Sequence, residues 1–240
     1  MSVSANVRSR ATESSDDYLK AVLELSGDAR QQVSAGDLAT ALNISRASVT
    51  KMLQKLSATQ PPLLIYEKHH GVQLAEAGAE RALEIVRHHR LIETFLHRVL
   101  AYPWDEVHDE AERLEHFISE RFEERIAAKL GNPLTDPHGH LIPERSGALP
   151  ARTEVRLSTW ACGLPAVISS VSDRNPGALR EMKRLGLGPG TPITVETGTR
   201  KAGLRVRIGE APSSVLLSQS LAAGISVVAR NENLSEPASG

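Results

Sequence analysis

Residues 34–56 read SAGDLATALNISRASVTKMLQKL and predict two helices separated by a tight turn. Ser34 is a residue type that caps helix N-termini, and Asp37 three residues later completes a capping-box-like pair. After the turn at 43–45, a helix is expected over residues 46–56. Its buried face would carry Val49, Met52, Leu53 and Leu56. A helix, a short turn and a helix at this spacing predict a helix-turn-helix.

The segments on either side complete a winged domain. Residues 14–17 (SSDD) offer N-caps for a helix that comes before the helix-turn-helix and ends at Gly27. Residues 1–13 are expected to form a disordered arm. Residues 63–67 and 72–74 predict two strands around a turn, which places a hairpin directly after the recognition helix. We therefore expect a winged helix-turn-helix DNA-binding domain over residues 14–75.

The rest of the chain divides into a helical part and a β part. Residues 76–100 and 105–130 predict two long helical regions, and the apolar face at 85–96 is expected to join two subunits. Later β-prone runs around one helix at 176–185 predict a small, partly open β-barrel. The expected segments are a helical domain at 76–143, a linker at 144–154, the barrel at 155–230 and a loose tail at 231–240. The fold class is mainly α with a β domain.

Composition excludes several classes of protein. The 240 residues carry a formal net charge of −1 and are 40% hydrophobic, which indicates a soluble globular chain without wholesale affinity for nucleic acid. No apolar run approaches the roughly 20 residues that span a bilayer, and the polar N-terminus lacks the apolar core of a secretory signal. The single cysteine, Cys162, fits a reducing compartment. We expect a cytoplasmic protein without membrane contact.

Charge is unevenly distributed along the chain. Between residues 43 and 56 the charged residues are Arg46, Lys51 and Lys55 with no acid, whereas residues 103–128 contain nine acids and three arginines. Basic residues on a helix are often merely solvated, but their place on the second helix of a helix-turn-helix favours contact with DNA. The candidate DNA-binding residues are Ser45, Arg46, Ala47, Ser48, Thr50 and Lys51.

The acidic segment holds a candidate metal site. Seven of the nine histidines fall in the helical domain, interleaved with carboxylates. On a helix, Glu112, Glu115 and His116 share one face because they stand at positions i, i+3 and i+4. Two carboxylates and an imidazole suit Mn²⁺, Fe²⁺ or Zn²⁺. The i, i+4 pattern recurs at His89 and Glu93. A solvated acidic helix with incidental histidines is the alternative, but two neighbouring clusters favour metal.

Six short motifs, in their order and spacing, resemble the diphtheria toxin repressor family of metal-dependent regulators. They are residues 17–19 (DYL), 48–52 (SVTKM), 88–93 (HHRLIE), 107–112 (VHDEAE), 114–116 (LEH) and 136–139 (DPHG). The resemblance is closest to the manganese-responsive branch with a C-terminal barrel. It covers nearly the whole chain, weakest beyond residue 151. It implies a winged helix domain, a helical metal-binding and dimerisation domain, and an SH3-like (FeoA-like) β-barrel.

For the primary metal site, the resemblance implies one ligand from the first helix and three from the second helical region. Here these are Asp17, Glu112, Glu115 and His116. The iron-responsive branch has Met and Cys where this chain has Asp17 and Glu112, and replacing soft sulfur by carboxylate oxygen favours Mn²⁺. The shorter manganese regulators have a Glu at the position of Lys20, so this chain departs from their two-metal primary arrangement.

The second, ancillary site implied by the resemblance starts from His89 and Glu93. The iron branch adds the equivalent of His108, whereas its barrel ligands would fall near Asn175 and Ala178 and are not kept. The manganese branch with a barrel adds the loop at residues 136–138 and an acid of the barrel. The ancillary candidates are His89, Glu93, His108, Asp136, His138 and Asp173, although Asp136 and His138 also suit a plain turn.

These features predict a metal-dependent transcriptional repressor that is not an enzyme. It would sense Mn²⁺, with Fe²⁺ as the alternative and Co²⁺, Zn²⁺ or Cd²⁺ as surrogates, bind two ions per subunit and control metal-uptake genes. A homodimer would place two recognition helices in successive major grooves of a DNA operator, roughly 34 Å apart.

Two other functions compete with this one. A metallohydrolase would also use carboxylates and histidines, but the chain has no His-Glu-x-x-His motif, phosphate loop or nucleophile elbow. A metal store or chaperone would not need a winged helix. Metal-dependent DNA binding distinguishes the repressor from both.

Overall fold

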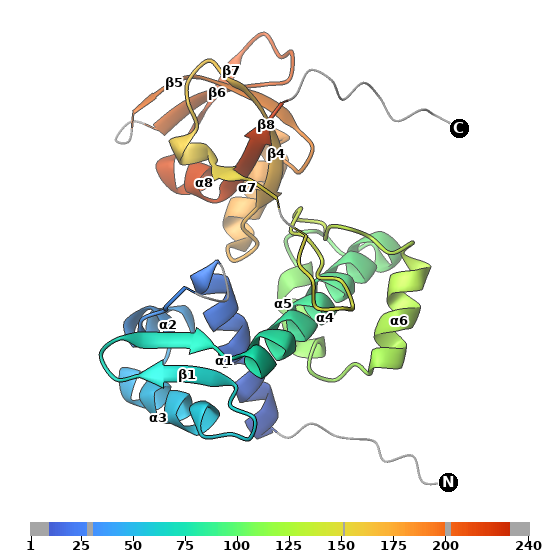
Figure 1. Cartoon of the computed structure of the whole chain (residues 1–240). Coiled ribbons are helices and arrows are strands. Elements are labelled where there is room, and N and C mark those ends of the chain that lie inside the picture. Colours follow the sequence, from blue (N-terminus) through green and yellow to red (C-terminus); the bar gives the residue numbers. More distant parts are fainter. Residues whose placement is uncertain (1–9, 28–30, 151, 200–202, 231–240) are drawn as a thin grey trace. The chain divides into compact units, whose positions relative to one another are not determined.

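The computed structural model describes residues 10–27, 31–150, 152–199 and 203–230 (Figure 1). The chain forms two compact units. The first comprises residues 1–92, 111–132 and 142–150, and the second comprises residues 93–110, 133–141 and 151–240. Of the arm predicted at 1–13, residues 1–9 lie outside the described residues. The tail predicted at 231–240 lies wholly outside them. Among the described residues no helix is long and apolar enough to cross a membrane.

The first unit opens with α1 (Arg10–Ser26). The caps predicted at residues 14–17 are wrong, since these residues lie inside the helix. The sequence RATE at 10–13 contains good helix formers, and Asp16 accepts hydrogen bonds from Arg81 instead of capping. The predicted end is confirmed, because Gly27 follows with a φ of 62°, a left-handed conformation that glycine adopts readily.

The helix-turn-helix is confirmed as α2 (Ala35–Ala41) and α3 (Arg46–Ser57). The Ser34 hydroxyl accepts a hydrogen bond from the backbone N–H of Asp37 at 3.0 Å. Ser45 likewise accepts from the N–H of Ser48 at 3.1 Å, so each helix begins at a side-chain cap. On α3 the predicted inner face is confirmed, with Val49, Leu53 and Leu56 buried and Met52 half-buried.

A two-stranded hairpin forms the predicted wing. Strands β1 (Leu64–Glu67) and β2 (Gly71–Leu74) pair antiparallel with Leu64 opposite Leu74. Figure 1 shows the hairpin beside α1, α2 and α3. Leu64 and Val72 belong to the apolar core that those helices share, so the wing is fixed to the helix-turn-helix by burial.

Helix α4 (Glu76–Leu100) has the predicted bounds. The second helical region does not, because it is divided into α5 (Val107–Leu114) and α6 (Glu120–Lys129). After α5 the N–H of Phe117 donates to the carbonyl of Leu114 at 2.9 Å, which tightens the last turn. Ser119 then caps α6 by accepting from Phe122.

The apolar face of α4 does not join subunits as predicted. Ile85, Leu91 and Ile92 are at most 3% exposed within the chain itself, so a second copy cannot reach them. In α5, α6 and the turn between them, the large apolar side chains that remain exposed are Leu114, Phe117 and Phe122. The prediction failed because the sequence pattern marks an apolar face without identifying the element that covers it.

A buried ionic network ties α4 to α6. Glu123 is 5% exposed and accepts a hydrogen bond from Arg87 at 2.5 Å, while Nε2 of His88 lies 3.1 Å from its other oxygen. Arg87 also donates to the carbonyl of Pro143 at 2.6 Å. Burial alone would raise the pKa of Glu123, but the contacts with His88 and Arg87 outweigh it and hold that pKa below its usual value.

Glu123→Gln is expected to lower the free energy of unfolding of the first unit by about 2–4 kcal/mol at pH 7, because Arg87 loses its buried counter-charge. The carboxylate has a lowered pKa in the folded state, so its contribution is complete above the unfolded value of roughly 4.3 and is lost as the pH falls through the folded value. Urea unfolding followed by circular dichroism should therefore separate the two proteins at pH 7, and the difference in their free energies of unfolding should shrink as the pH is lowered below about 4. A difference that stays constant as the pH falls would contradict this origin.

The second unit is built on a six-stranded antiparallel sheet in the order β3-β8-β4-β5-β6-β7. Its strands are β3 (Val155–Arg156), β4 (Pro165–Val171), β5 (Pro192–Thr199), β6 (Gly203–Ile208), β7 (Ser214–Leu217) and β8 (Ile225–Ala229). Within the described ranges β3 and β7 do not pair with each other, which agrees with the predicted partly open barrel. The short β3 was not predicted.

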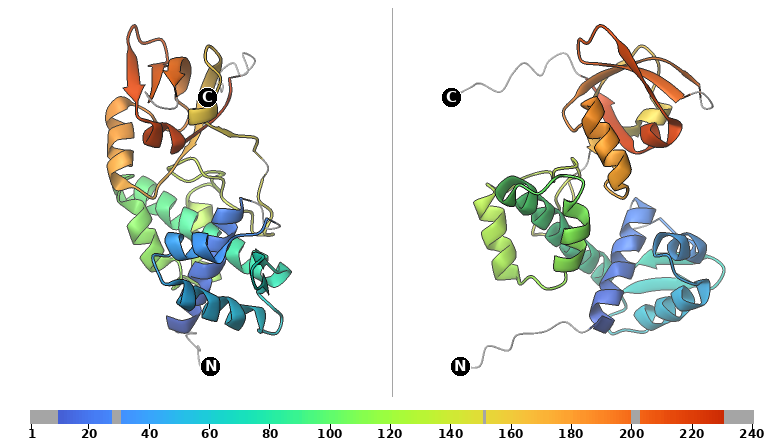
Figure 2. Two further views of the ribbon diagram at one scale, coloured as in Figure 1. Left: turned by 90° about the vertical axis from the view of Figure 1, so that its left-hand side faces the viewer. Right: turned by 180° about the vertical axis from the view of Figure 1, so that it is seen from behind.

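Helices cover the apolar side of this sheet. Helix α7 (Pro176–Leu185) has the predicted bounds, with Asn175 as its N-cap, and α8 (Gln219–Ala223) was not predicted. Figure 2 shows both helices next to the strands. Leu179 and Leu221 enter the same core as the inward-facing strand residues, so the β part has a core of its own.

Candidate metal centre

The first cluster joins three elements of the first unit and consists of Asp17, His89, Glu112, Glu115 and His116. Asp17 lies on α1, His89 on α4 and Glu112 on α5, while Glu115 and His116 lie in the turn that follows α5. The N–H of Glu115 still donates to the carbonyl of Ala111 at 2.9 Å. The turn therefore continues the helical path far enough to keep Glu115 and His116 near Glu112.

Three of the predicted primary ligands meet directly. Nε2 of His116 lies 3.0 Å from an oxygen of Asp17 and 3.6 Å from an oxygen of Glu115. Ligand atoms of these three residues all lie within 4.8 Å of one another. Glu115 is fully buried and His116 is 6% exposed, whereas Asp17 is only half-buried. A donor set of two carboxylates and an imidazole on a partly open site fits a divalent ion of borderline hardness.

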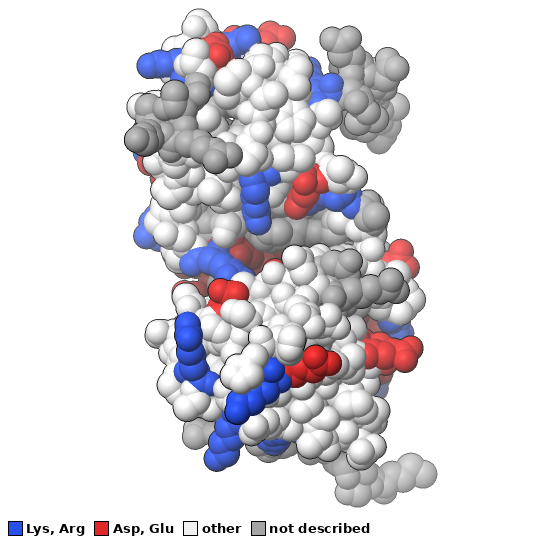
Figure 3. All heavy atoms as spheres, turned by 60° about the vertical axis from the view of Figure 1, so that its left-hand side comes forward, with Lys and Arg blue, Asp and Glu red and all other residues white. Residues whose placement is uncertain are grey.

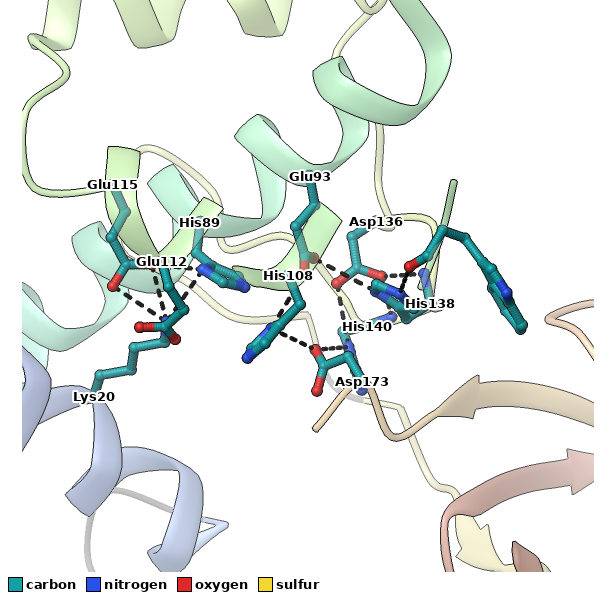
Figure 4. A network of polar contacts seen from close by, with 11 residues as sticks. Lys20, His89, Glu93, His108, Glu112, Glu115, Asp136, His138, His140 and Asp173 are labelled. Atoms are coloured by element: carbon teal, nitrogen blue, oxygen red, sulfur yellow. Dashed lines mark hydrogen bonds and ion pairs between the residues drawn. The ribbon is translucent and has the colours of Figure 1, made fainter. Parts of the chain in front are cut away.

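The fourth predicted ligand, Glu112, forms an ion pair with Lys20. The Lys20 Nζ donates to Glu112 at 2.6 Å and to Glu115 at 2.9 Å, and it lies 3.1 Å from Nδ1 of His89 (Figure 4). Burial opposes ionisation of Lys20, but the charges of Glu115 and Glu112 outweigh it, so the pKa of Lys20 is raised above its ordinary value. Lys20 is therefore a buried cation inside the predicted metal site.

His89 also lies in the first cluster, although it was predicted as an ancillary ligand. Its Nδ1 is 2.5 Å from an oxygen of Glu115, and the ring is 4% exposed. Glu93 stands one helical turn later on the same face of α4. His89, Glu112 and Glu115 form a second group whose ligand atoms lie within 4.8 Å of one another.

A further carboxylate, Asp16, lies near the second ring nitrogen of His116, although the sequence predicted it as a helix cap. Asp16 is 2% exposed, accepts two hydrogen bonds from Arg81 at 2.8 and 3.0 Å, and lies 3.6 Å from Nδ1 of His116. A carboxylate behind the second ring nitrogen is a usual support for a metal-binding histidine. Burial lowers the pKa of His116, but Asp16 and Asp17 outweigh it and raise that pKa to about 9.

The second cluster lies in the second unit and consists of Glu93, His108, Asp136, His138, His140 and Asp173. Nδ1 of His108 lies 3.4 Å from Glu93 and 3.6 Å from Asp173. Nδ1 of His140 lies 3.6 Å from the same oxygen of Asp173 (Figure 4). Asp173 follows β4, so the barrel contributes an acid to this cluster as predicted.

The loop between α6 and the linker holds three members of this cluster. Asp136 accepts hydrogen bonds from the N–H groups of His138 and His140 at 2.8 and 3.0 Å, so one of its oxygens shapes the loop. Its other oxygen lies 3.2 Å from Nδ1 of His140. His140 was not among the predicted residues; the alternation of histidines at 138 and 140 is the signal that could have found it. Asp136, His138 and His140 form a further group within 4.8 Å.

His138 carries the feature that best fits a bound cation. It is fully buried, and its Nε2 lies 2.8 Å from the carbonyl of Trp104. Its buried Nδ1 makes no hydrogen bond among the described residues and lies 3.6 Å from Glu93. Burial lowers the pKa of His138, but Glu93 outweighs it and raises that pKa to about 9. The two atoms form an ion pair at 3.6 Å, and a metal ion that displaces the ring proton could be held by both of them.

The predicted DNA-contacting residues lie on α3 and at its N-cap. Ser45, Arg46, Ala47, Ser48 and Lys51 are exposed, and Thr50 is half-buried. Thr50 donates to the carbonyl of Arg46, so its hydroxyl is engaged within the helix. Lys and Arg side chains gather on the lower part of the face in Figure 3, where the winged helix part lies, with acidic side chains beside them. A groove lined by Asp17 and Tyr18 of α1 and by Lys51 of α3 separates the two helices.

Comparison with protein families matches three successive parts of the chain. Residues 10–72 match the iron-dependent repressor N-terminal DNA-binding domain. Residues 75–144 match the iron-dependent repressor metal-binding and dimerisation domain, and residues 155–229 match the FeoA domain.

Individual relatives come from both metal branches. The iron-dependent repressor IdeR of Mycobacterium tuberculosis is 31% identical over 193 residues, which cover 75% of this chain and 82% of that protein. The regulator MntR of Bacillus subtilis is 35% identical over 118 residues, which cover 48% of this chain and 78% of that protein. A solved structure of a manganese-dependent transcriptional repressor in complex with manganese matches with a TM-score of 0.83 and 36% identity, covering 90% of this chain and all of that one.

Proposed function

Since the chain belongs to the diphtheria toxin repressor family of metal-dependent, DNA-binding transcriptional repressors, we propose that Mn²⁺ is the ion that activates it. The observation that supports this choice is the donor set of Asp17, Glu115 and His116, which contains oxygen and nitrogen but no sulfur. Hard oxygen ligands favour Mn²⁺ over softer competitors, and Fe²⁺ is the alternative with similar ligand preference.

The first cluster is proposed to control the orientation of the recognition helix. Asp17 lies on α1, which shares an apolar core with α2 and α3, whereas Glu115 and His116 lie beyond α4. A bound ion would supply a cross-link between α1 and the turn after α5. Because α1 and α3 share one core, fixing α1 also fixes α3 relative to the helical part.

The second cluster is proposed to hold a second ion. Glu93, His108, His138 and Asp173 would be its ligands, with His140 added from the structure. Asp136 is proposed mainly to shape the loop, because it accepts two backbone hydrogen bonds there. Two ions per subunit follow from one ion in each cluster.

The active species is proposed to be a homodimer on a DNA operator in the cytoplasm. The exposed apolar residues Leu114, Phe117 and Phe122 belong to the part of the chain that matches the dimerisation domain, and a second copy would cover them. Each α3 would enter a major groove with Arg46, Ser48 and Lys51 toward the DNA. Genes for metal uptake are the proposed targets.

DNA selection tests this function directly. The purified chain is incubated with a random-sequence DNA library in Mn²⁺ or in chelator, and the selected fragments are measured by mobility shift. We expect retained fragments only with metal, and sedimentation at twice the 26.0 kDa chain mass. Mn²⁺ and Fe²⁺ should both activate DNA binding, and Co²⁺ and Zn²⁺ should act as surrogates, since N/O sites generally bind them more tightly than Mn²⁺. Equal DNA binding with and without metal would contradict the proposal.

Lys51→Ala is expected to weaken DNA binding without changing Mn²⁺ affinity, because Lys51 is exposed on α3 outside the metal clusters. If Lys51 contacts phosphate, the salt slope of binding should fall by about one unit per subunit. If it reads a guanine edge, one operator position should relax at a cost of roughly 1–3 kcal/mol. The control is Lys129→Ala on α6, which removes an exposed lysine from another helix. Unchanged affinity and unchanged salt slope would show that α3 is not in the groove.

A further inference from the structure

A pocket of about 410 Å³ lies in the second unit, and its described lining residues include none of the proposed metal ligands. The lining includes His97 of α4, Trp104, and Lys183, Leu187, Gly188 and Pro189 at the end of α7 and in the turn after it. Leu187 is fully buried, whereas Lys183 and Pro189 are exposed. Pockets that hold small organic molecules usually measure about 300–1,000 Å³ and combine apolar walls with a few polar groups. The size and the mixed lining of this pocket therefore fit a small organic ligand.

Trp104 brings to this pocket a hydrogen-bond donor that lacks an acceptor. The residue is 9% exposed, and its buried indole N–H makes no hydrogen bond among the described residues. Trp160 shows the usual arrangement, since its indole N–H donates to the carbonyl of Leu164 at 3.0 Å. A buried donor without a partner is unfavourable, because it has lost water and gained nothing in exchange. An acceptor atom supplied by a ligand would therefore be stabilised at Trp104.

The charges around the pocket favour a negatively charged ligand. Its described lining contains two bases and no carboxylate. Asp105, beside the tryptophan, is already paired with Arg180 at 3.1 Å. On α7, Glu181 is likewise paired with Arg184 at 2.6 Å. Lys183 has no acidic partner among the described residues, so its ammonium is available to attract an anion.

We propose that this pocket binds a small organic anion. A carboxylate of the ligand would accept from the Trp104 N–H and pair with Lys183, while the apolar body of the ligand packs on Leu187. The site goes beyond the metal-dependent function, although it borders the second cluster. The carbonyl of Trp104 lies 2.8 Å from Nε2 of His138, and the indole stacks on that ring with centroids 5.8 Å apart. A ligand on Trp104 would therefore be a second chemical signal besides metal.

Nuclear magnetic resonance of the indole N–H groups tests the proposal, with benzoate as the probe. The full chain is labelled with ¹⁵N and loaded with Zn²⁺ as a diamagnetic surrogate of Mn²⁺, and Trp160→Phe assigns the indole resonances. Benzoate, titrated at constant ionic strength, is expected to move the Trp104 proton resonance downfield in a saturable way, because the carboxylate accepts its hydrogen bond. The Trp160 resonance should stay in place, since that N–H already donates to Leu164. Benzamide, which lacks the charge, should bind roughly two- to fivefold more weakly, and the cation benzylammonium should not bind.

Substitutions at two positions connect the resonance change to this pocket. Lys183→Gln should weaken benzoate binding roughly two- to fivefold, as expected for an exposed ion pair, whereas Lys129→Gln on α6 should leave it unchanged. Gly188→Leu should abolish binding, because a Cβ there meets nothing within 4 Å and the longer side chain would fill the pocket. Gly188→Ala is its control and should retain binding. A Trp104 resonance that benzoate leaves in place, equal movement of both indole resonances, or unchanged benzoate affinity in Lys183→Gln would overturn the proposal.

Discussion

His116→Ala is expected to lower Mn²⁺-dependent DNA binding by about a hundredfold or more while leaving the fold intact. Loss of partners that merely support a metal ligand costs roughly 10–100-fold in affinity, so loss of the ligand itself should reach at least the upper end. Nε2 of His116 lies between Asp17 on α1 and Glu115 beyond α4, and it is the only nitrogen in that set. In the variant, the carboxylates of Asp17 and Glu115 remain to hold an ion between α1 and the turn after α5. Dialysis should show one Mn²⁺ lost per subunit, and mobility shift should show the lost DNA binding.

The control for this variant is His97→Ala. His97 is exposed near the end of α4, and its Nδ1 lies 2.9 Å from the carbonyl oxygen of Tyr102. It should keep both ions and full DNA binding. The pKa of His116 is raised to about 9, so its ring must lose a proton before it binds a metal ion. Mn²⁺ uptake at the first cluster should therefore release a proton in the unaltered chain. His116→Ala should not release this proton. Unchanged Mn²⁺ stoichiometry in His116→Ala would remove this residue from the site.

Local sequence signals were sufficient for most of the elements. Ser34 accepts the hydrogen bond that its position predicted, and α4 and α7 have the predicted bounds. These features depend on residues within one or two turns of each other, which is the range over which capping and periodicity act. The break after Leu114 escaped prediction because acidic residues on both sides suit a helix equally well, and only the Ser119 cap marks the new start.

The metal sites were predictable as sets of residues but not as geometry. Spacing brought together Glu112, Glu115 and His116 on one side of a helix, and the structure keeps the last two beside Asp17. The sequence spacing could not show that Lys20 would pair with Glu112, because that contact joins residues 92 positions apart. The same holds for Asp16, which faces His116 across 100 positions and therefore looked like a helix cap.

Gly139→Ala is expected to destabilise the second unit by about 3 kcal/mol or more and to remove its metal ion. Gly139 has a φ of 86°, and a Cβ there would lie 2.2 Å from the carbonyl oxygen of Ser169 and 3.0 Å from Pro189. A left-handed conformation costs a non-glycine residue roughly 1–2 kcal/mol, and overpacking adds about 1–3 kcal/mol. Gly139 separates His138 from His140, so any shift that relieves the contact moves two members of the second cluster.

Gly190→Ala separates these two causes, because Gly190 has a φ of 85° but nothing within 4 Å of its added Cβ. It should show the conformational cost alone, roughly 1–2 kcal/mol, and retain its metal.

Both tryptophans of the chain, Trp104 and Trp160, lie in the second unit, so fluorescence during urea unfolding reports that unit selectively. Trp104 also stacks on His138 with ring centroids 5.8 Å apart, so bound paramagnetic Mn²⁺ should quench it in the unaltered chain and in Gly190→Ala but not in Gly139→Ala. Equal stability and equal quenching in the two variants would show that the close approach to Ser169 does not hold the loop, and that the second cluster is positioned by the hydrogen bonds of Asp136 alone.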